Sequence, residues 1–335
     1  MSVTVRDIAK AAKVSVGTVS RALKNQPGMA ERTRRRIRDI AVSLGYDFER
    51  LQSEPIRRIA FLLHRQHKLS ATAFFSEVLH GVEDACSSLG VSLSFLAVGP
   101  ADPVMAQLSR HEADALICAG YFEPELLQLL RQSGKPMVLV DQWSLDFTSV
   151  NPDNETGAYL VTRHLLDTGR QRIAFLAHSL AHFSIRQRER GFRRALFEAG
   201  ILADPGLDVV APPGADVETG VAFLTQHLLA LPKPPDAIFA YNDAAALLTM
   251  RHCQEAGFSV PDDIAIAGFD DIAMAALSNP PLTTVHVDKP QLGRRGVELL
   301  MQAAASRSEE TLPVELVVRD STRPTSSPSR PTPHA

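Results

Sequence analysis

The segment VSVGTVSRALK near the N-terminus combines groups that could read base edges in DNA with groups that could bind phosphate. The guanidinium of Arg21 can donate two hydrogen bonds to guanine, a contact worth about 1–3 kcal/mol of discrimination. Val16 presents an apolar side chain that could meet a thymine methyl group, and Gly17 presents only backbone. Two hydroxyls suit phosphate oxygens, those of Thr18 and Ser20. The segment therefore predicts a short helix that reads DNA, with Arg21 as its main hydrogen-bonding residue.

Three short helices are predicted to position these side chains. The first begins after Thr4, because TVRD resembles a capping box, and Ser15 can cap the second. The third spans about 31–44, and Gly45 stands where a helix is expected to stop. Apolar residues at helical spacing form the expected core: Val5, Ile8, Ala9, Ala12, Val19, Ala22, Leu23, Ile37, Ile40, Ala41 and Leu44. Two short helices joined by a tight turn, with a third packed on them, form a helix-turn-helix unit whose second helix enters the major groove.

A basic head is joined to a larger acidic body. Residues 1–58 hold 13 Lys/Arg and six Asp/Glu, a net charge of +7, whereas residues 59–335 hold 22 and 32, a net charge of −10. This asymmetry indicates a nucleic-acid-binding module fused to a second unit. The run RTRRRIR is expected either to attract DNA without reading its sequence or simply to form a solvated face. The other residues expected at the DNA are Thr4, Arg6, Ser15, Lys24 and Thr33.

The composition argues against several classes of protein. No apolar run approaches the ~20 residues of a membrane-spanning helix, and the N-terminus lacks the apolar core of a secretory signal. We therefore expect a cytoplasmic protein with no membrane partner. Cys86, Cys118 and Cys253 are widely spaced and are expected to be reduced thiols in apolar segments. No H-x-x-x-H pattern is accompanied by a nearby acid, so neither a metal nor a cofactor is predicted.

From Ile59 onward, short apolar runs alternate with helical stretches. RIAFLLH precedes FFSEVLHGVEDACSSLG, DALICAG precedes PELLQLLRQSG, and the pattern continues through RIAFLAH, AIFAYND and DIAIAGFDD. Buried parallel strands read as continuous apolar runs and need helical crossovers. The body is therefore predicted to be a doubly wound α/β unit of two similar lobes, with ligands bound at the carboxyl ends of the strands. The alternation by itself is compatible with an enzyme and with a binding protein.

The head resembles the DNA-binding domain of the LacI/GalR family of bacterial transcription regulators. The resemblance rests on VTVRDIAKAAKVSVGTVSRALKNQP. It implies that the two residues after the Ser15 cap, Val16 and Gly17, choose the operator. Lys13 departs from the glycine that is usual in the turn, and Lys24 stands where an asparagine is common.

The stretch after the head departs from the family pattern. Members usually continue Y-x-P-N-x-x-A-x-x-L, a hinge helix whose leucine enters the minor groove, but here Tyr46 is followed by DFERLQSEP. Counting back from Ile59 places Leu51 at the wedge spacing, in a shortened hinge of residues 47–58. We expect Leu51 either to wedge into the minor groove or to be an ordinary linker leucine. In the first case Leu51→Ala should reduce DNA bending and operator affinity together.

The body resembles the same family as far as about residue 323. Matching segments occur in family order, and they include VNPDNETGAYLVTRHLL, RERGFRRAL, VPDDIAIAGFDD and NPPLTTVHVDKPQLG. The resemblance implies a periplasmic-binding-protein-like pair of lobes that close on a small effector. Carried over residue by residue, it places these at the effector: Phe74, Phe75, Trp143, Asp153, His182, Ser184, Arg188, Asn242 and Asp270. Strand-end amides and carboxylates suit vicinal hydroxyls, and aromatic rings suit the apolar face of a sugar.

Structural roles stay open for several of these residues. Arg188 could form a buried salt bridge with Asp153 or Asp270. Trp143 could serve lobe packing, and either phenylalanine of the FF pair could lie in the core. Asp271 is expected to cap the following helix rather than to bind ligand.

The predicted architecture has four parts. A three-helix helix-turn-helix head (1–46) is followed by the hinge (47–58), a two-lobed doubly wound α/β body (59–322) and a disordered tail rich in Ser, Pro and Thr (323–335). The N-lobe is expected at about 59–155 plus 286–310, and the C-lobe at about 156–285 plus 311–322.

The expected function is that of a sequence-specific transcriptional regulator, and a repressor, since most members of the family repress. Two heads of a homodimer, or of a tetramer, would bind a pseudo-palindromic double-stranded operator. A small effector, expected to be a sugar or sugar derivative, would change operator affinity. The alternatives are a DNA-binding regulator without effector control and a solute-binding receptor of the same fold. An enzyme is disfavoured, because no nucleophile elbow, phosphate loop or G-x-G-x-x-G stands at a strand end.

Overall fold

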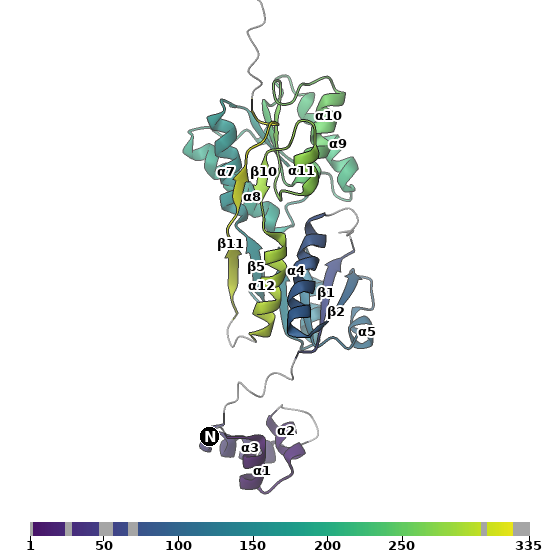
Figure 1. Cartoon of the computed structure of the whole chain (residues 1–335), viewed down its shortest axis with the longest axis vertical. Helices are drawn as coiled ribbons and strands as arrows, with labels where there is room; N and C mark the ends of the chain where they lie inside the picture. Colours follow the sequence, from purple (N-terminus) through teal and green to yellow (C-terminus); the bar gives the residue numbers. More distant parts are fainter. Residues whose placement is uncertain (1–2, 24–28, 47–55, 66–72, 303–306, 324–335) are drawn as a thin grey trace, which may run out of the picture. The chain divides into compact units, whose positions relative to one another are not determined.

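The computed structural model describes residues 3–23, 29–46, 56–65, 73–302 and 307–323. The chain forms two units, the head (residues 1–56) and the body (residues 57–335) (Figure 1). Lys24, Leu51 and the tail beyond residue 323 lie outside the described residues, so the expectations for them stay predictions.

The head consists of α1 (Val5–Ala12), α2 (Val16–Leu23) and α3 (Glu31–Ser43). The starts of α1 and α2 have the predicted caps. The Thr4 hydroxyl oxygen accepts the Asp7 N–H, and the Asp7 carboxylate accepts the Thr4 N–H in return. The Ser15 hydroxyl oxygen accepts the Thr18 N–H at 3.1 Å. These bonds satisfy backbone donors that the start of a helix otherwise leaves unpaired.

A small apolar core joins the three helices of the head. Ile8, Val19 and Ile37, one from each helix, are almost fully buried. The predicted burial of Leu44 is wrong, because α3 ends before it and its side chain at the C-cap is 39% exposed. The turn after α1 holds Lys13 at φ +54°, a left-handed conformation that costs a residue with a Cβ about 1–2 kcal/mol. The departure from glycine at this position therefore weakens the head slightly.

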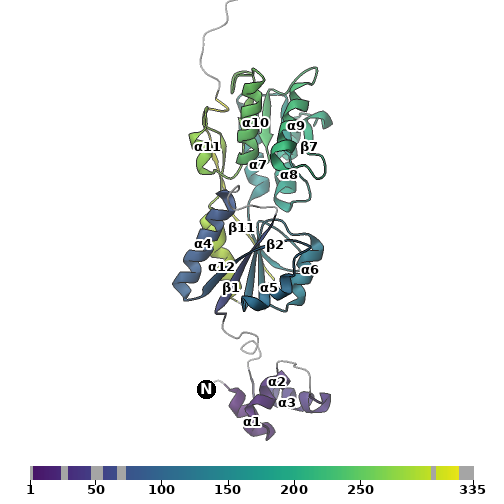
Figure 2. The same ribbon diagram turned by 90° about the vertical axis from the view of Figure 1, so that its right-hand side faces the viewer.

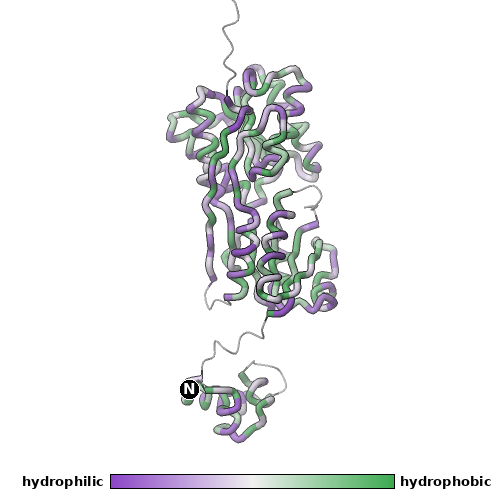
Figure 3. The backbone as a smooth tube through the Cα atoms, in the orientation of Figure 1, coloured by the Kyte–Doolittle hydropathy of each residue, from purple (hydrophilic) through white to green (hydrophobic). Residues whose placement is uncertain are grey.

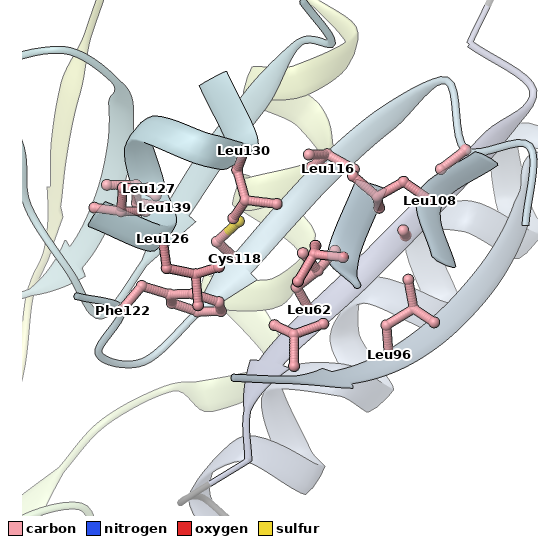
Figure 4. Packing of buried hydrophobic residues seen from close by; sticks show 14 residues of the cluster. Leu62, Leu96, Leu108, Leu116, Cys118, Phe122, Leu126, Leu127, Leu130 and Leu139 are labelled. Carbon is pink, nitrogen blue, oxygen red and sulfur yellow. The ribbon is translucent and has the colours of Figure 1, made fainter. Parts of the chain in front are cut away.

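The N-lobe of the body is built on a six-stranded parallel sheet with the order β11-β5-β4-β3-β1-β2. Its strands are β1 (Arg58–His64), β2 (Ser92–Val98), β3 (Ala115–Ala119), β4 (Met137–Val140), β5 (Thr148–Pro152) and β11 (Glu309–Leu312). Its helices are α4 (Ala73–Leu89), α5 (Val104–Arg110), α6 (Pro124–Gln132) and α12 (Lys289–Met301). Helices α4 and α12 cover one face of the sheet, and α5 and α6 cover the other (Figure 2). On the second face Leu62, Leu116 and Leu139 of the strands pack with Leu108 and Leu130 of the helices (Figure 4).

Helices α4 and α12 approach each other so closely that two positions must be glycine. A Cβ on Gly81 of α4 would lie 2.0 Å from the carbonyl oxygen of Pro290. A Cβ on Gly293 of α12 would lie 2.1 Å from the carbonyl oxygen of Val78. Neither backbone atom can move aside cheaply, so the contact fixes the position of α12 on the sheet.

The C-lobe is built on a four-stranded parallel sheet with the order β7-β6-β8-β9. Its strands are β6 (Ile173–Ala177), β7 (Asp208–Val210), β8 (Ala237–Ala240) and β9 (Ala265–Ala267). Its helices are α7 (Asn154–Asp167), α8 (Phe183–Glu198), α9 (Val217–Leu229), α10 (Asp243–Glu255) and α11 (Ala273–Leu277). A separate antiparallel pair is formed by β10 (Thr284–His286) and β12 (Glu315–Val317). Hydrophobic segments occur in the head and in both lobes (Figure 3), as separate cores require.

The predicted two-lobed α/β body is confirmed, and the apolar runs of the sequence form its central strands. The alternation of apolar and helical segments did not predict β5, β7, β10 and β12, because these strands are short and carry no long apolar run. The chain passes between the lobes at residues 152–154, 286–289 and 312–315. Among the described helices, none combines the length and the apolar character that a bilayer crossing requires.

Candidate functional site

The start of α2 is exposed and carries the residues predicted to choose the operator. Val16 is 46% exposed, and Gly17 and Arg21 are exposed as well. A Cβ on Gly17 would meet nothing closer than the Ser15 Oγ at 3.9 Å. One guanidinium N–H of Arg21 donates to the Gly17 carbonyl oxygen at 3.4 Å. The open space around Gly17 allows this face of α2 to approach another molecule closely.

Some of the predicted phosphate-binding hydroxyls also serve the fold of the head. The Thr18 and Ser15 hydroxyls are hydrogen-bonded to each other at 2.8 Å, and the Thr4 hydroxyl donates to the Asp7 carboxylate at 2.6 Å. A hydroxyl has one donor and two acceptor positions, so an internal bond leaves capacity for a phosphate or its water. Thr4, Arg6, Ser15 and Thr33 are exposed, whereas Thr18 and Ser20 are half-buried.

In the body, a buried network of charges is centred on Arg188 of α8, whose side chain is 4% exposed. Its Nε donates to the Asn154 Oδ1 at 2.8 Å, and its Nη1 donates to the Tyr241 carbonyl oxygen at 2.5 Å. Its Nη2 lies 3.2 Å from the Asp270 Oδ1. The guanidinium carbon also lies 3.8 Å from the centroid of the Phe269 ring. Of the two salt bridges left open for Arg188, the one with Asp270 forms and the one with Asp153 does not.

Asp270 holds a second buried cation near this network. The ammonium of Lys289, 2% exposed, donates to the Asp270 carbonyl oxygen at 2.7 Å and lies 3.8 Å from the Glu77 carboxylate. Burial raises the pKa of Asp270 to about 6, although Arg188 and Lys289 oppose the shift by favouring the ionised form. The cations thus keep a carboxylate ionised where burial alone would neutralise it.

Asp141 brings a carboxyl group from the N-lobe to the same place. It follows the last residue of β4 at φ +59°, a left-handed conformation. Its Oδ1 is buried and has no hydrogen-bond partner among the described residues. Burial raises the pKa of Asp141 to about 7; Arg188 and the Ser184 hydroxyl lower it, and the charge of Asp270 raises it. A buried carboxylate oxygen without a donor is a point where a bound molecule could supply one.

The N-cap of α8 and the first two residues of the helix contact side chains of the N-lobe. The His182 ring stacks on Tyr121 with ring centroids 4.7 Å apart. The Phe183 ring lies 6.0 Å from the Trp143 ring at an interplanar angle of 22°. Ser184, which is buried, follows directly and approaches Asp141. The Trp143 Nε1 donates to the Glu309 Oε2 at 2.8 Å.

Four other predicted effector residues have structural contacts. Phe74 and Phe75 are buried in α4, with their rings 5.1 Å apart and edge to face. Asp153 caps α7 by accepting the Thr156 N–H, and Asn242 caps α10 by accepting the Ala245 N–H. Their assignment to the effector stays a prediction.

The predicted cap by Asp271 is wrong. The residue before α11 is Ile272, and the Asp271 carboxylate instead bonds Arg319 at 2.6 Å and His286 at 2.9 Å. These partners are 48 and 15 residues away in the sequence, so no local pattern could have predicted them.

Comparison with known proteins identifies the family. Residues 4–47 match the bacterial regulatory proteins of the lacI family, and residues 162–322 match a periplasmic binding protein-like domain. The HTH-type transcriptional repressor PurR of Photobacterium profundum is 31% identical over 96% of this chain and 98% of its own length. The chain belongs to the lacI family of bacterial regulatory proteins.

Solved structures of lacI-family proteins share the whole architecture. The cellobiose complex of the transcriptional regulator CelR has a TM-score of 0.73 and 26% identity, covering 95% of this chain and 99% of that one. The Lac repressor dimer bound to operator and the anti-inducer ONPF has a TM-score of 0.69 and 25% identity, covering 96% and 99%. This lacI-family protein is accordingly a DNA-binding transcriptional repressor with a helix-turn-helix head and a periplasmic-binding-protein-like body.

Five residues at the meeting point of the lobes of this lacI-family protein were not predicted to lie there: Tyr121, Asp141, Asn154, Phe183 and Lys289. One of them had a usable signal. Asp141 directly follows the apolar run MVLV, which is where a strand-end ligand group is expected. The others could not be found without the fold, because their partners come from distant segments.

Proposed function

We propose that this repressor binds a small effector between the two lobes of its body and that the effector changes its affinity for a pseudo-palindromic operator. The head reads the operator through Val16, Gly17 and Arg21, with the surrounding hydroxyls and basic groups at phosphates. No catalytic role is assigned to any residue, and the protein works in the cytoplasm, where its DNA is.

The observation that carries the effector site is the buried Oδ1 of Asp141. It lies at the end of a parallel strand, the usual ligand position in such sheets. The opposite lobe presents Arg188 and Ser184 to it. A ligand hydroxyl or amine that donates to this oxygen would satisfy a group whose burial is otherwise costly.

A sugar or sugar derivative fits this chemistry best. Vicinal hydroxyls can donate to Asp141 and accept from Arg188 or Ser184, and the rings of Trp143 and Tyr121 can cover an apolar ring face. The CelR neighbour is described as a cellobiose complex, which supports a carbohydrate in this fold. Because the relatives include repressors named PurR, the ligand screen below also contains nucleobases and nucleosides and distinguishes them from sugars.

A homodimer is part of the proposal, because a two-fold protein matches a pseudo-palindrome. The Lac repressor neighbour is described as a dimer on its operator. The body exposes apolar side chains on both lobes that a partner subunit could cover: Leu89, Phe95, Met274 and Leu277. Leu277, 75% exposed, is the most accessible of them. Light scattering of the wild-type chain and of Leu277→Asp tests this, and a wild-type monomer at micromolar concentration would refute it.

DNA binding is tested with the full chain on operator DNA selected from a random pool. Binding should be sequence-specific and should weaken steeply with salt. It should disappear when residues 1–50 are deleted, while the body remains folded by circular dichroism. Binding that persists without the head would contradict the assignment of DNA reading to α2.

Effector binding is tested by a thermal-shift screen of sugars, sugar phosphates, nucleobases and nucleosides. A hit should raise the unfolding temperature of the wild-type chain and change its operator affinity. Asp141→Asn should abolish the thermal shift, and Asp146→Asn, on the same lobe, should retain it. A complete panel without a hit would favour a regulator that has no small-molecule control.

A further inference from the structure

Three consecutive residues, the N-cap of α8 and its first two helical residues, each contact a residue at one end of the N-lobe sheet. His182 stacks on Tyr121, Phe183 on Trp143, and Ser184 approaches Asp141. These contacts join the lobes directly, through side chains of this chain alone. The lobes are therefore closed on each other at this point by the protein's own residues.

The N-lobe partners come from neighbouring strands. Tyr121 follows β3 and Trp143 follows β4, and these strands pair in parallel with Ala119 opposite Val140. Parallel neighbours end at the same edge of a sheet, so both aromatic rings stand at one edge and face the same turn of α8. The interplanar angles of 29° and 22° make both contacts stacked rather than edge to face.

Trp143 is also held in place from its own lobe. Its indole N–H donates to Glu309, the first residue of β11. That strand leads directly into a segment that passes to the C-lobe. The indole is 36% exposed, and this bond restricts its rotation and so helps to preserve the stack with Phe183.

We propose that the two stacked pairs Tyr121–His182 and Trp143–Phe183 act as a clasp that keeps the lobes closed when no effector is bound. The inference rests on the proposed function, because it describes the regulation of the proposed effector site. Any effector therefore acts on an equilibrium that is already biased toward the closed form. An effector that binds against the Tyr121 or Trp143 ring has to compete for that ring face with His182 or Phe183.

The clasp is tested by the rate at which a thiol reagent reaches the lobe boundary in the effector-free full chain. Ser184→Cys is the reporter, since position 184 is 5% exposed while the lobes are closed. Labelling then requires opening, and its rate follows the open fraction even when that fraction is small. Cys86, Cys118 and Cys253 are buried, and the wild-type chain gives their background rate.

Removing an N-lobe ring should speed labelling. An aromatic pair is worth about 0.5–1.5 kcal/mol, so Tyr121→Ala and Trp143→Ala in the reporter chain should each raise the rate roughly 2- to 10-fold. Tyr121→Phe, which keeps the stack, should leave the rate near that of the reporter chain. The matched control is Phe197→Ala, which removes an exposed ring from the other end of α8, outside the boundary, and should change nothing.

The pairing itself is tested by the double variant Tyr121→Ala/His182→Ala. If the two rings act through one contact, the double variant labels no faster than Tyr121→Ala alone. The clasp would be overturned if the rate increases of the Tyr121→Ala and His182→Ala single variants multiplied in the double variant. It would also be overturned if the Tyr121→Ala and Trp143→Ala chains were labelled as slowly as the reporter chain. Operator binding and the ligand screen with the wild-type chain report on the proposed function separately, because neither measurement depends on the labelling rate.

Discussion

In the head, the polar residues expected to bind DNA lie exposed or half-buried on short helices or at their caps, and their internal bonds are to residues three or four positions away. In the body, the charged residues at the meeting point of the lobes are buried, and each is held by partners from several segments. The head therefore presents its polar and basic groups on the surface, where they can bind the negatively charged DNA directly. The body keeps charges away from water, where a small ligand can interact with them strongly.

This contrast predicts different costs for mutating a binding residue in the two units. A head residue should affect binding and leave folding intact. A residue of the buried network should affect folding at least as much as binding, because its buried partners lose a compensating contact.

The largest effect is expected for Arg188→Ala. It leaves the buried Asp270 carboxylate without the guanidinium that pairs with it, and breaking such a pair costs about 3–5 kcal/mol of unfolding free energy. Urea unfolding of the full chain measures it. The control is Arg186→Ala on the same helix, whose exposed side chain donates to two backbone carbonyls, and it should cost far less. Equal costs for the two would break the contrast between the units.

Arg21→Ala should have the next largest effect, on binding alone. Loss of the guanine contact should weaken specific operator binding by about 1–3 kcal/mol, or roughly 5- to 150-fold. The unfolding curve should not change, because Arg21 is exposed. Fluorescence anisotropy with operator and with random DNA measures the loss. Val16→Ala serves as the comparison, and it should relax preference at one base pair only. A footprint that survives Arg21→Ala unchanged would remove this residue from base reading.

Asp141→Asn should stabilise the chain, and the gain should depend on pH. The pKa of Asp141 is raised from 3.8 to about 7 in the folded chain, so the folded state holds this proton more tightly than the unfolded state. The wild type therefore loses stability as the pH rises from about 4 to about 7, and the loss is complete above pH 7. Asparagine removes this loss, so the gain should be absent near pH 4, grow as the pH rises, and reach its maximum above pH 7. Thermal unfolding across this range measures it, and a gain that does not vary with pH would show that ionisation of Asp141 is not its source.

The smallest effect is expected for Gly17→Ala. The open space around Gly17 accommodates a methyl group, and alanine is up to ~1 kcal/mol better than glycine in a helix. Calorimetry of the full chain should show a more stable head and an unchanged body.

Gly81→Ala is the opposite case in the body, because its Cβ would lie 2.0 Å from a backbone oxygen, and it should cost about 1–3 kcal/mol or more.

The sequence predicted the head almost completely. Its caps, Thr4 with Asp7 and Ser15 with Thr18, join residues three positions apart, and its core follows the helical period. The one error, Leu44, falls at a helix end, where a shift of one residue decides whether a side chain turns inward. In the body, the apolar runs predicted the central strands for the same reason, since continuous hydrophobicity is a local property.

The sequence by itself determined the helix-turn-helix head, the two-lobed α/β body and the exposed start of α2, because caps, periodicity and apolar runs act over a few neighbouring residues. Only the tertiary structure decided which charges share the buried network. The partners of Arg188 lie 34, 53 and 82 residues away, and the clasp joins Tyr121 to His182 and Trp143 to Phe183 across the two lobes. The physical reason is that desolvation and pairing depend on what surrounds a group in space. That environment exists only after both sheets have formed and the chain has crossed between them.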